Sequence, residues 1–163
     1  MSNKRIDSLR LSISPYTQEF LDCSWEWLND PEVKALTATP DFSREQQLAW
    51  YATLASKKDY LIWGVKLDTN PVGVFGVKNI NNGSGEYWGY IGSKELWGSG
   101  IGTWMMQQVL DISAKAGLSR IYLKVLKNNV AAIRLYEKMQ FNRYDADQEF
   151  DWMERGIDSR NMK

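Results

Sequence analysis

Histidine is absent from this chain of 163 residues, and its absence removes several kinds of chemistry at once. Without an imidazole there is no Ser–His or Cys–His nucleophile pair, so a general base has to be a carboxylate or a chain of water molecules. The single cysteine, Cys23, excludes an internal disulfide, and the lack of histidine excludes a Cys/His metal cluster. Nothing identifiable in the sequence would activate the Cys23 thiol, so we expect a packed side chain rather than a nucleophile, and we expect no metal.

Long apolar runs are also missing. The longest uninterrupted one, "YLIWGV", is far too short to span a bilayer, and the opening "MSNKRIDSLRLS" lacks the apolar stretch of a signal peptide. The 20 basic and 20 acidic residues cancel, so no overall field draws the chain to nucleic acid or to an anionic membrane. We therefore expect a cytoplasmic protein whose partners are neither nucleic acid nor membrane.

The chain has more aromatic residues than a small core needs. Eight tryptophans and eight tyrosines occur in a length that is typical of one domain. No repeat, low-complexity segment or linker interrupts the sequence, so residues 1–163 are predicted to form a single domain. Some of the aromatic rings are expected to line a site.

Hydrophobic periodicity predicts a mixture of strands and helices. Alternation favours an opening strand at 8–14, an antiparallel meander at 60–67, 72–80 and 86–92, a strand at 120–126 and final strand character within 141–154. Helical spacing favours helices at 17–30, 41–56, 101–116 and 129–139, with Pro31 ending the first. Ser43 with Gln46 three residues later is typical of a capping box. These elements predict a mixed α/β fold.

A glycine-rich stretch, "WGSGIG", lies at the entrance of the predicted helix 101–116. Glycines at a strand-to-helix turn let the main chain approach a ligand closely, and the first helical N–H groups have no partners within the helix. Such amides, together with the helix dipole, form a site for phosphate. The alternative is a tight connection with a helix packed close to a sheet, which is less favoured for three alternating glycines, Gly98, Gly100 and Gly102, than for one.

Two common phosphate-binding signatures do not fit this stretch. A Walker loop needs Gly-Lys followed by Ser or Thr, but Gly102 is followed by Thr103 and Trp104. A dinucleotide-binding fold needs an acidic residue at the end of the next strand, where this chain has Leu126 to Asn128. The phosphate ligand is thus expected to be of another kind.

The stretch from Glu86 to Phe141 resembles the GNAT superfamily of acetyl-CoA-dependent N-acetyltransferases. In "WGSGIG" the glycines of the family's phosphate motif match at Gly100 and Gly102, while Trp97 stands where Gln or Arg is usual. The family's second signature matches at Asn129, Ala132, Tyr136 and Phe141, with Gln140 in place of a glycine. The N-terminal part also resembles a branch that holds ribosomal-protein N-terminal acetyltransferases and acetyltransferases of nucleotide-linked amino sugars.

The resemblance implies a largely antiparallel central sheet with helices on both faces and two splayed central strands. It implies that acetyl-CoA is the cosubstrate and that its thioester arm lies between those strands. The implied coenzyme-binding residues are Tyr90, Ile91, Gly92, Gly98, Gly100, Ile101, Gly102, Thr103 and Asn129. Asn129 is equally a good N-cap for the helix that it opens.

The resemblance also suggests catalytic roles for two residues. Tyr136 is the candidate acid that protonates, or donates a hydrogen bond to, the departing thiolate; a Tyr at this helical position could instead be a buried aromatic. Glu86 is the weaker candidate for a general base, because a carboxylate beside the turn "NNGSG" could simply lie at the edge of a turn.

Residues for the acceptor are less well defined. Trp25, Trp50 and Trp88 could stack on a sugar or a base, although Trp at helical spacing is more often core. Asp145, Asp147, Glu149 and Asp151 would share one face of a strand, where they would be solvated or would attract a cationic amine.

Together these features favour an enzyme that moves an acetyl group from acetyl-CoA directly to a primary amine. The favoured small-molecule acceptor is an amino sugar, and a nucleotide-linked one above others. Alternatives are acetylation of protein or peptide N-termini, a non-catalytic acyl-CoA sensor, which the Trp97 and Gln140 departures would allow, and a sugar-binding module. A homodimer is left open.

Overall fold

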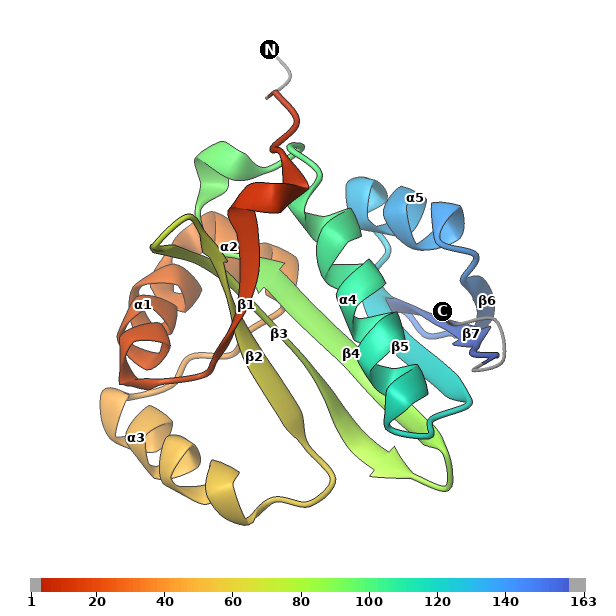
Figure 1. Cartoon of the computed structure of the whole chain (residues 1–163), viewed down its shortest axis with the longest axis horizontal. Coiled ribbons are helices and arrows are strands. Elements are labelled where there is room, and N and C mark those ends of the chain that lie inside the picture. Colours follow the sequence, from red (N-terminus) through yellow and green to blue (C-terminus); the bar gives the residue numbers. More distant parts are fainter. Residues whose placement is uncertain (1–3, 159–163) are drawn as a thin grey trace.

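In the computed structural model, residues 4–158 are described. Their centre is a seven-stranded sheet with the strand order β1-β2-β3-β4-β5-β7-β6 (Figure 1). The strands are β1 (Leu11–Pro15), β2 (Leu61–Leu67), β3 (Asn70–Asn81), β4 (Ser84–Ile91), β5 (Arg120–Leu126), β6 (Asn142–Ala146) and β7 (Phe150–Gly156). The predicted opening strand therefore begins later than expected, because Ser8–Arg10 form a 3-10 turn that Asp7 caps.

Every neighbouring pair of strands is antiparallel except β4 and β5, which are parallel. This parallel pair has only three registered positions, from Ser84 opposite Arg120 to Glu86 opposite Tyr122. Beyond them β4 continues to Ile91 and β5 to Leu126 without pairing, and the two strands open into a V (Figure 1). The expected splay of two central strands is thus confirmed.

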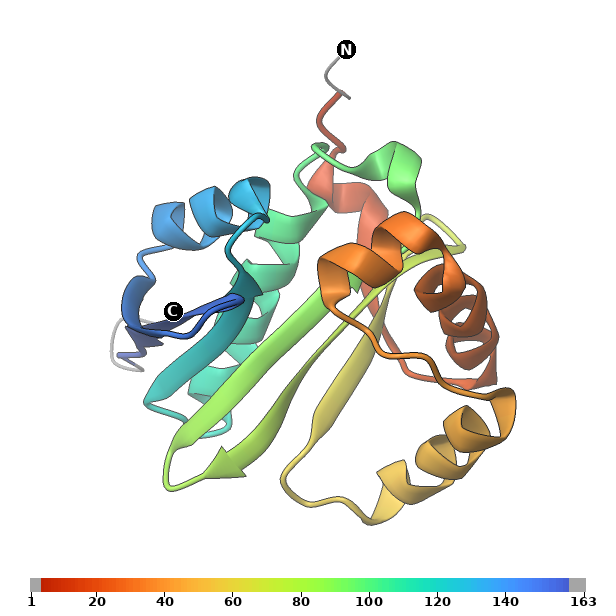
Figure 2. The same ribbon diagram turned by 180° about the vertical axis from the view of Figure 1, so that it is seen from behind.

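Helices cover both faces of the sheet. Figures 1 and 2 show α4 (Ile101–Lys115) and α5 (Val130–Lys138) on one face, and α1 (Gln18–Asn29), α2 (Pro31–Thr37) and α3 (Arg44–Thr53) on the other. The short 3-10 segments η2 (Leu54–Ser56) and η3 (Lys94–Leu96) follow α3 and β4. Within residues 4–158, every helix falls short of the length and apolar content that a membrane span requires.

The helix ends show where local signals succeeded and where they did not. Ser43 and Gln46 form the expected capping box at the start of α3. Pro31 does follow the end of α1, but it also occupies the first turn of α2, which the sequence analysis missed. Asp30 caps α2 by accepting hydrogen bonds from the amides of Glu32 and Val33.

The main core lies between α4 and the sheet. Fully buried side chains meet there from α4, β3 and β5: Ile101, Met105, Met106, Val109, Phe75, Val77, Ile121 and Leu123. Because β4 and β5 belong to one sheet but diverge, α4 must anchor both strands from one side. Tyr87 of β4 belongs to the same core, so α4 packs against both strands of the V.

The acidic residues near the C-terminus do not lie on one strand, which corrects the sequence-based expectation. Asp147 lies in the turn between β6 and β7, where its carboxylate accepts hydrogen bonds from the amides of Glu149 and Phe150. The Asp151 carboxylate lies 3.8 Å from the Lys127 ammonium and 3.7 Å from the Arg143 guanidinium. Asp147 therefore stabilises the hairpin turn and Asp151 lies near two cations, so the four acids do not form a row on one strand.

Candidate active site

A cavity of about 560 Å³ occupies the splayed region of the sheet. Alternate residues of β4 point to opposite faces of the sheet. Glu86, Trp88 and Tyr90 line the cavity from one face, whereas Tyr87 lines it from the face that α4 covers. The cavity therefore passes through the gap between β4 and β5. Its wall also includes Tyr136 of α5 and Asn129, the residue before that helix.

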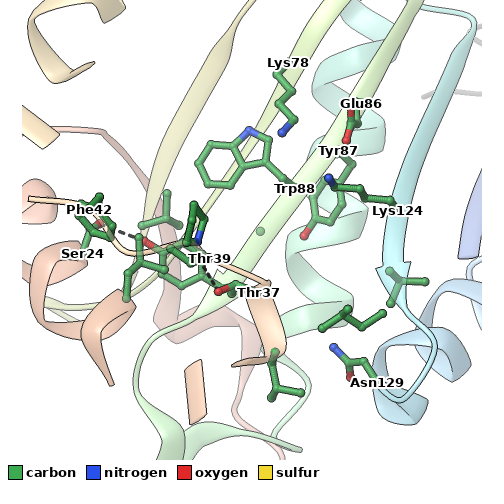
Figure 3. Close-up of a pocket in the computed structure, with 18 of the residues that line it drawn as sticks. Ser24, Thr37, Thr39, Phe42, Lys78, Glu86, Tyr87, Trp88, Lys124 and Asn129 are labelled. Atoms are coloured by element: carbon green, nitrogen blue, oxygen red, sulfur yellow. Dashed lines mark hydrogen bonds between the residues drawn. The ribbon is translucent and has the colours of Figure 1, made fainter. Parts of the chain in front are cut away.

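Three charged side chains gather at one end of the cavity. Lys78 of β3 lies opposite Glu86 in the strand register, and Lys124 of β5 lines the same space. Figure 3 shows these three side chains around Trp88 and Tyr87, with Asn129 towards the other end. Glu86 is 6% exposed, and its Oε1 accepts a hydrogen bond of 3.1 Å from the side-chain amide of Asn79. The cavity thus combines one buried carboxylate with two lysines.

Tyr136 is positioned by aromatic packing. Its ring meets Tyr87 edge-on at 6.4 Å between centroids and lies 6.0 Å from Phe141. Burial raises the pKa of Tyr136 to about 12, and its hydroxyl has no hydrogen-bond partner among residues 4–158. The phenol is therefore neutral at physiological pH and available as a donor at the cavity wall.

A hydroxyl bridge fixes the splayed end of β4 to α1. Tyr16 and Tyr90 both donate hydrogen bonds to the buried Ser24 hydroxyl, at 2.9 and 3.1 Å. Burial raises the pKa of Tyr16 to about 12 and holds the pKa of Tyr90 far above its ordinary value. Both phenols therefore stay neutral, and α1 replaces β5 as the neighbour that holds this part of β4.

The candidate tryptophans separate into two groups. Trp88 and Trp50 line the cavity, and Tyr60 lies between them with ring centroids 6.1 and 6.4 Å away. Trp88 packs against Gly76, where an added Cβ would come within 2.8 Å of the indole. Trp25 lies outside the cavity lining and packs edge-on against Phe42 at 5.3 Å.

The glycine-rich stretch forms the connection into α4. Gly98 and Gly100 have φ angles of 79° and 98°, which side chains other than glycine rarely adopt. Gly100 is the N-cap and provides no side chain, so the first amides of α4 find no capping partner. A Cβ added at Gly98 would meet nothing within 4 Å, so there is open space at this residue, whereas a Cβ added at Gly100 would lie 3.5 Å from the Arg5 guanidinium carbon. This arrangement suits an anion such as a diphosphate.

Gly102 also allows α4 and α5 to pack closely, because a Cβ there would come within 2.9 Å of the Leu135 side chain of α5. Trp97 is also structural: its indole N–H donates to the Ile91 carbonyl at 2.9 Å. The Gly92 amide donates to the Val72 carbonyl at 2.8 Å. The Ile91 carbonyl and the Gly92 amide thus have partners within the chain, in addition to the pairing of Tyr90 and Ile91 with β3.

Several further predicted residues have definite places. Asn129 caps α5 by accepting a hydrogen bond from the Ala132 amide, and it also lines the cavity. Cys23 lies outside the cavity lining, and burial raises the pKa of its thiol, which makes it a poor nucleophile. Residues 4–158 contain no group of three or more acidic or cysteine side chains that could hold a metal ion.

Sequence reasoning missed the two lysines and Asn79. Period-two alternation in the predicted strands would have placed Lys78 on the same face as Gly76, and Lys124 on the same face as Tyr122. The pattern does not give the strand register, however, and only the register places Lys78 and Tyr122 opposite Glu86. Phe150 was missed because the β6–β7 hairpin, which the sequence analysis did not predict, brings it to the cavity wall.

A seven-stranded sheet with a splayed parallel pair, a cavity through the gap and a glycine-rich helix entrance defines the N-acetyltransferase class of fold. The sequence profile of the Acetyltransferase (GNAT) family matches residues 20–141. The match covers most of the chain, which therefore belongs to this family.

Known relatives resemble it at low identity. Acetyltransferase PseH of Campylobacter jejuni is 26% identical over 136 residues, which cover 80% of this chain and 82% of PseH. An uncharacterised protein of Methanocaldococcus jannaschii is 24% identical over 151 residues, or 88% of this chain but only 30% of that longer protein. The chain thus spans under a third of that relative.

Solved structures share the fold. The structure of PseH in complex with acetyl coenzyme A has a TM-score of 0.72 at 18% identity, with 91% of this chain and 99% of that one covered. Spermidine N-acetyltransferase from Vibrio cholerae, in complex with CoA and spermine, has a TM-score of 0.83 at 19% identity, with 91% and 96% covered. These structures show a shared fold. As a member of the Acetyltransferase (GNAT) family, the chain is an acetyl-CoA-dependent N-acetyltransferase.

Proposed function

We propose that the chain acetylates the amine of an amino sugar that carries a nucleotide, and so an anionic diphosphate. The observation that carries this proposal is the pairing of Lys78 and Lys124 with aromatic rings around one buried carboxylate, Glu86. Phosphate groups favour ammonium partners, and flat rings favour the faces of sugars and bases.

Charge in the cavity argues against a polycationic acceptor. Two unit charges 6 Å apart interact by about 3 kcal/mol at an effective dielectric constant of 20. A polyamine would meet two such repulsions from Lys78 and Lys124 and one attraction from Glu86. A diphosphate would instead be attracted by both lysines, and Glu86 would stay free for the reacting amine.

The aromatic wall suits a sugar ring. Trp88 and Tyr60 lie with their planes tilted by 41° and their centroids 6.1 Å apart, beside Trp50. Phe150, whose ring lies 4.8 Å from the Lys124 ammonium, lines the cavity from the β7 side. Such rings bury the apolar face of a sugar and leave its hydroxyls for polar partners.

The coenzyme fits the splayed end. We propose that its diphosphate is held by the amides of Gly98, Gly100, Ile101, Gly102 and Thr103. The thioester arm would enter the gap beside Tyr90, Ile91 and Gly92, with Asn129 at the opposite wall. The open space at Gly98 and the uncapped start of α4 support this placement. The acetyl carbonyl would then lie between Tyr136 and Glu86.

The transfer follows from these positions. The neutral amine attacks the acetyl carbonyl, so an N–C bond forms and the C–S bond breaks. Glu86 takes the proton that the nitrogen loses, and Tyr136 donates a proton or hydrogen bond to the departing sulfur. No acyl-enzyme is needed, because Cys23 lies outside the cavity lining.

A panel of acceptors with a thiol-release readout tests the proposal. UDP-linked amino sugars, the same free amino sugars, peptides with free N-termini, and spermidine would be compared at equal acetyl-CoA. We expect the highest kcat/KM for the nucleotide-linked sugar and a loss of about tenfold or more when the nucleotide is removed. Turnover of peptides or spermidine alone would reject the proposed acceptor class.

A further inference from the structure

The second half of β3 contains an irregularity beside the cavity. The register of β3 with β4 shifts between Lys78 and Asn81, which marks a β-bulge. Within it Asn79 has a φ of 53°, in the left-handed region that few residues other than glycine adopt. Bulges of this kind are over-represented next to active sites, where they redirect a side chain.

The bulge brings two successive residues to one carboxylate. In a regular strand, residues 78 and 79 would point to opposite faces of the sheet. Here Lys78 lines the cavity opposite Glu86, and Asn79 nevertheless donates its side-chain amide to Glu86 Oε1 at 3.1 Å. The strained backbone therefore has a specific consequence at the buried carboxylate.

The hairpin turn does not require this conformation at Asn79. β3 ends at Asn81 and β4 begins at Ser84, so the turn residues are Asn82 and Gly83. Both have positive φ angles, 50° and 79°, as a two-residue hairpin turn demands. Asn79 lies three residues before the turn, so its left-handed backbone needs another explanation.

We propose that Asn79 is a positioning residue that fixes the Glu86 carboxylate for proton removal from the acceptor amine. The proposal rests on the role of Glu86 as the base in the proposed function. The bond from Asn79 is the one hydrogen bond that the Glu86 carboxylate receives among residues 4–158, and it occupies Oε1. Oε2 is therefore the oxygen left to receive the amine proton.

A neutral amide suits this task better than a cation. The charged or titratable groups that face Glu86 are Lys78 from β3, and Tyr122 and Lys124 from β5. An ion pair would hold a carboxylate in its charged form so strongly that it accepts protons poorly, whereas an amide orients it at less cost to basicity.

Three substitutions separate positioning from backbone effects. Asn79→Asp keeps the side-chain shape and tolerance for positive φ but puts an oxygen and a negative charge against Glu86. Asn79→Gly removes the amide while relieving the backbone. Asn82→Asp is the matched control, because it makes the same change at a left-handed asparagine of the nearby turn.

The readout is the pH profile of kcat for the acceptor with the highest turnover, at saturating acetyl-CoA. For Asn79→Asp we expect the acidic limb to move up by about one pH unit, since like charges raise the pKa of a carboxyl pair, and kcat at pH values below that limb to fall about tenfold. For Asn79→Gly we expect kcat to fall about tenfold with no loss of thermal stability. The Asn82→Asp profile should match wild type.

Opposite results would overturn the proposal. An Asn79→Asp profile that coincides with that of Asn82→Asp, or full kcat in Asn79→Gly, removes Asn79 from the positioning role. Glu86→Gln separates this failure from that of the proposed function. If Glu86→Gln lowers kcat while both Asn79 variants keep the wild-type kcat, only the positioning role of Asn79 is rejected. If Glu86→Gln keeps full kcat, Glu86 is not the base, and the Asn79 proposal is rejected with it.

Discussion

The two ends of β4 are built differently. At residues 84–86 the strand pairs on both sides, with β3 and β5, whereas from Tyr87 to Ile91 it has β3 alone. The paired end carries the buried carboxylate of Glu86, and the splayed end provides the gap through which the cavity passes. The difference indicates a division of labour. Under the proposed function, pairing on both sides, with a bulge in β3, holds the Glu86 carboxylate in place, and the missing β5 partner leaves room for the coenzyme arm.

The largest expected effect on kcat comes from removing the Tyr136 hydroxyl beside the gap. Tyr136→Phe keeps the ring and its packing against Tyr87 and Phe141 but removes the hydroxyl. We predict a fall in kcat of about 100-fold with little change in the affinity for acetyl-CoA. Steady-state kinetics together with calorimetric binding would measure both, and equal kcat in the mutant would remove Tyr136 from the acid role.

The pKa of Tyr136 adds a pH prediction. Burial raises this pKa to about 12, so the folded enzyme keeps the proton well above pH 10, where a free phenol would lose it. Deprotonation of Tyr136 should therefore cause no decline of kcat up to about pH 10. A decline near neutral pH that disappears in Tyr136→Phe would contradict this expectation.

A matched pair of glycines tests the coenzyme end. Gly100 and Gly117 lie at opposite ends of α4, with φ angles of 98° and 85°. Ala at either position should cost similar stability, about 1–2 kcal/mol. Only Gly100→Ala should weaken acetyl-CoA binding, by about 30-fold if about 2 kcal/mol of hydrogen bonding to the diphosphate is lost. Equal affinities for acetyl-CoA in the two variants would show that the turn does not bind the diphosphate.

The acceptor end is tested through its charges. Lys78→Met keeps most of the side chain but removes one cation from the cavity, and Lys115→Met removes one from the exposed far end of α4. We expect KM for a nucleotide-linked sugar to rise about fivefold in the first and to stay constant in the second, because screening reduces the interaction to about 1 kcal/mol. A lower KM for an anionic acceptor in Lys78→Met would contradict the anionic class.

The smallest effect should come from the bridge to α1. Ser24→Ala removes the acceptor that Tyr16 and Tyr90 share, and leaves two phenol groups without a partner. We predict a loss of about 2 kcal/mol in the free energy of unfolding. Denaturant unfolding would measure it, and an unchanged midpoint would show that β4 needs no support from α1.

Local sequence signals determined most of the fold. Helical spacing located α4 and α5, and the Ser43–Gln46 pair located the start of α3. The seven-residue α2 was missed because its Asp30–Pro31 start also looks like the end of α1. The β6–β7 turn was missed because it contains neither glycine nor proline, and Asp147 supplies the turn by side-chain hydrogen bonds.

The site was less predictable than the fold for a physical reason. Tyr136 and Asn129, which a short local motif predicts, line the cavity, as do Trp50, Trp88 and Glu86. The binding role of the glycine stretch stays a prediction. Lys78 and Lys124 required the register of three strands, which depends on long-range pairing. The bulge at Asn79 has no local signature, because an asparagine within a strand-like stretch does not by itself indicate a positive φ.

A crystal structure of the complex with acetyl-CoA tests the central claim most directly. We predict the diphosphate against the amides of residues 98–103, the arm between β4 and β5, and the acetyl group within reach of Tyr136 and Glu86. Coenzyme bound outside the gap, with the β4–β5 cavity empty, would contradict the account.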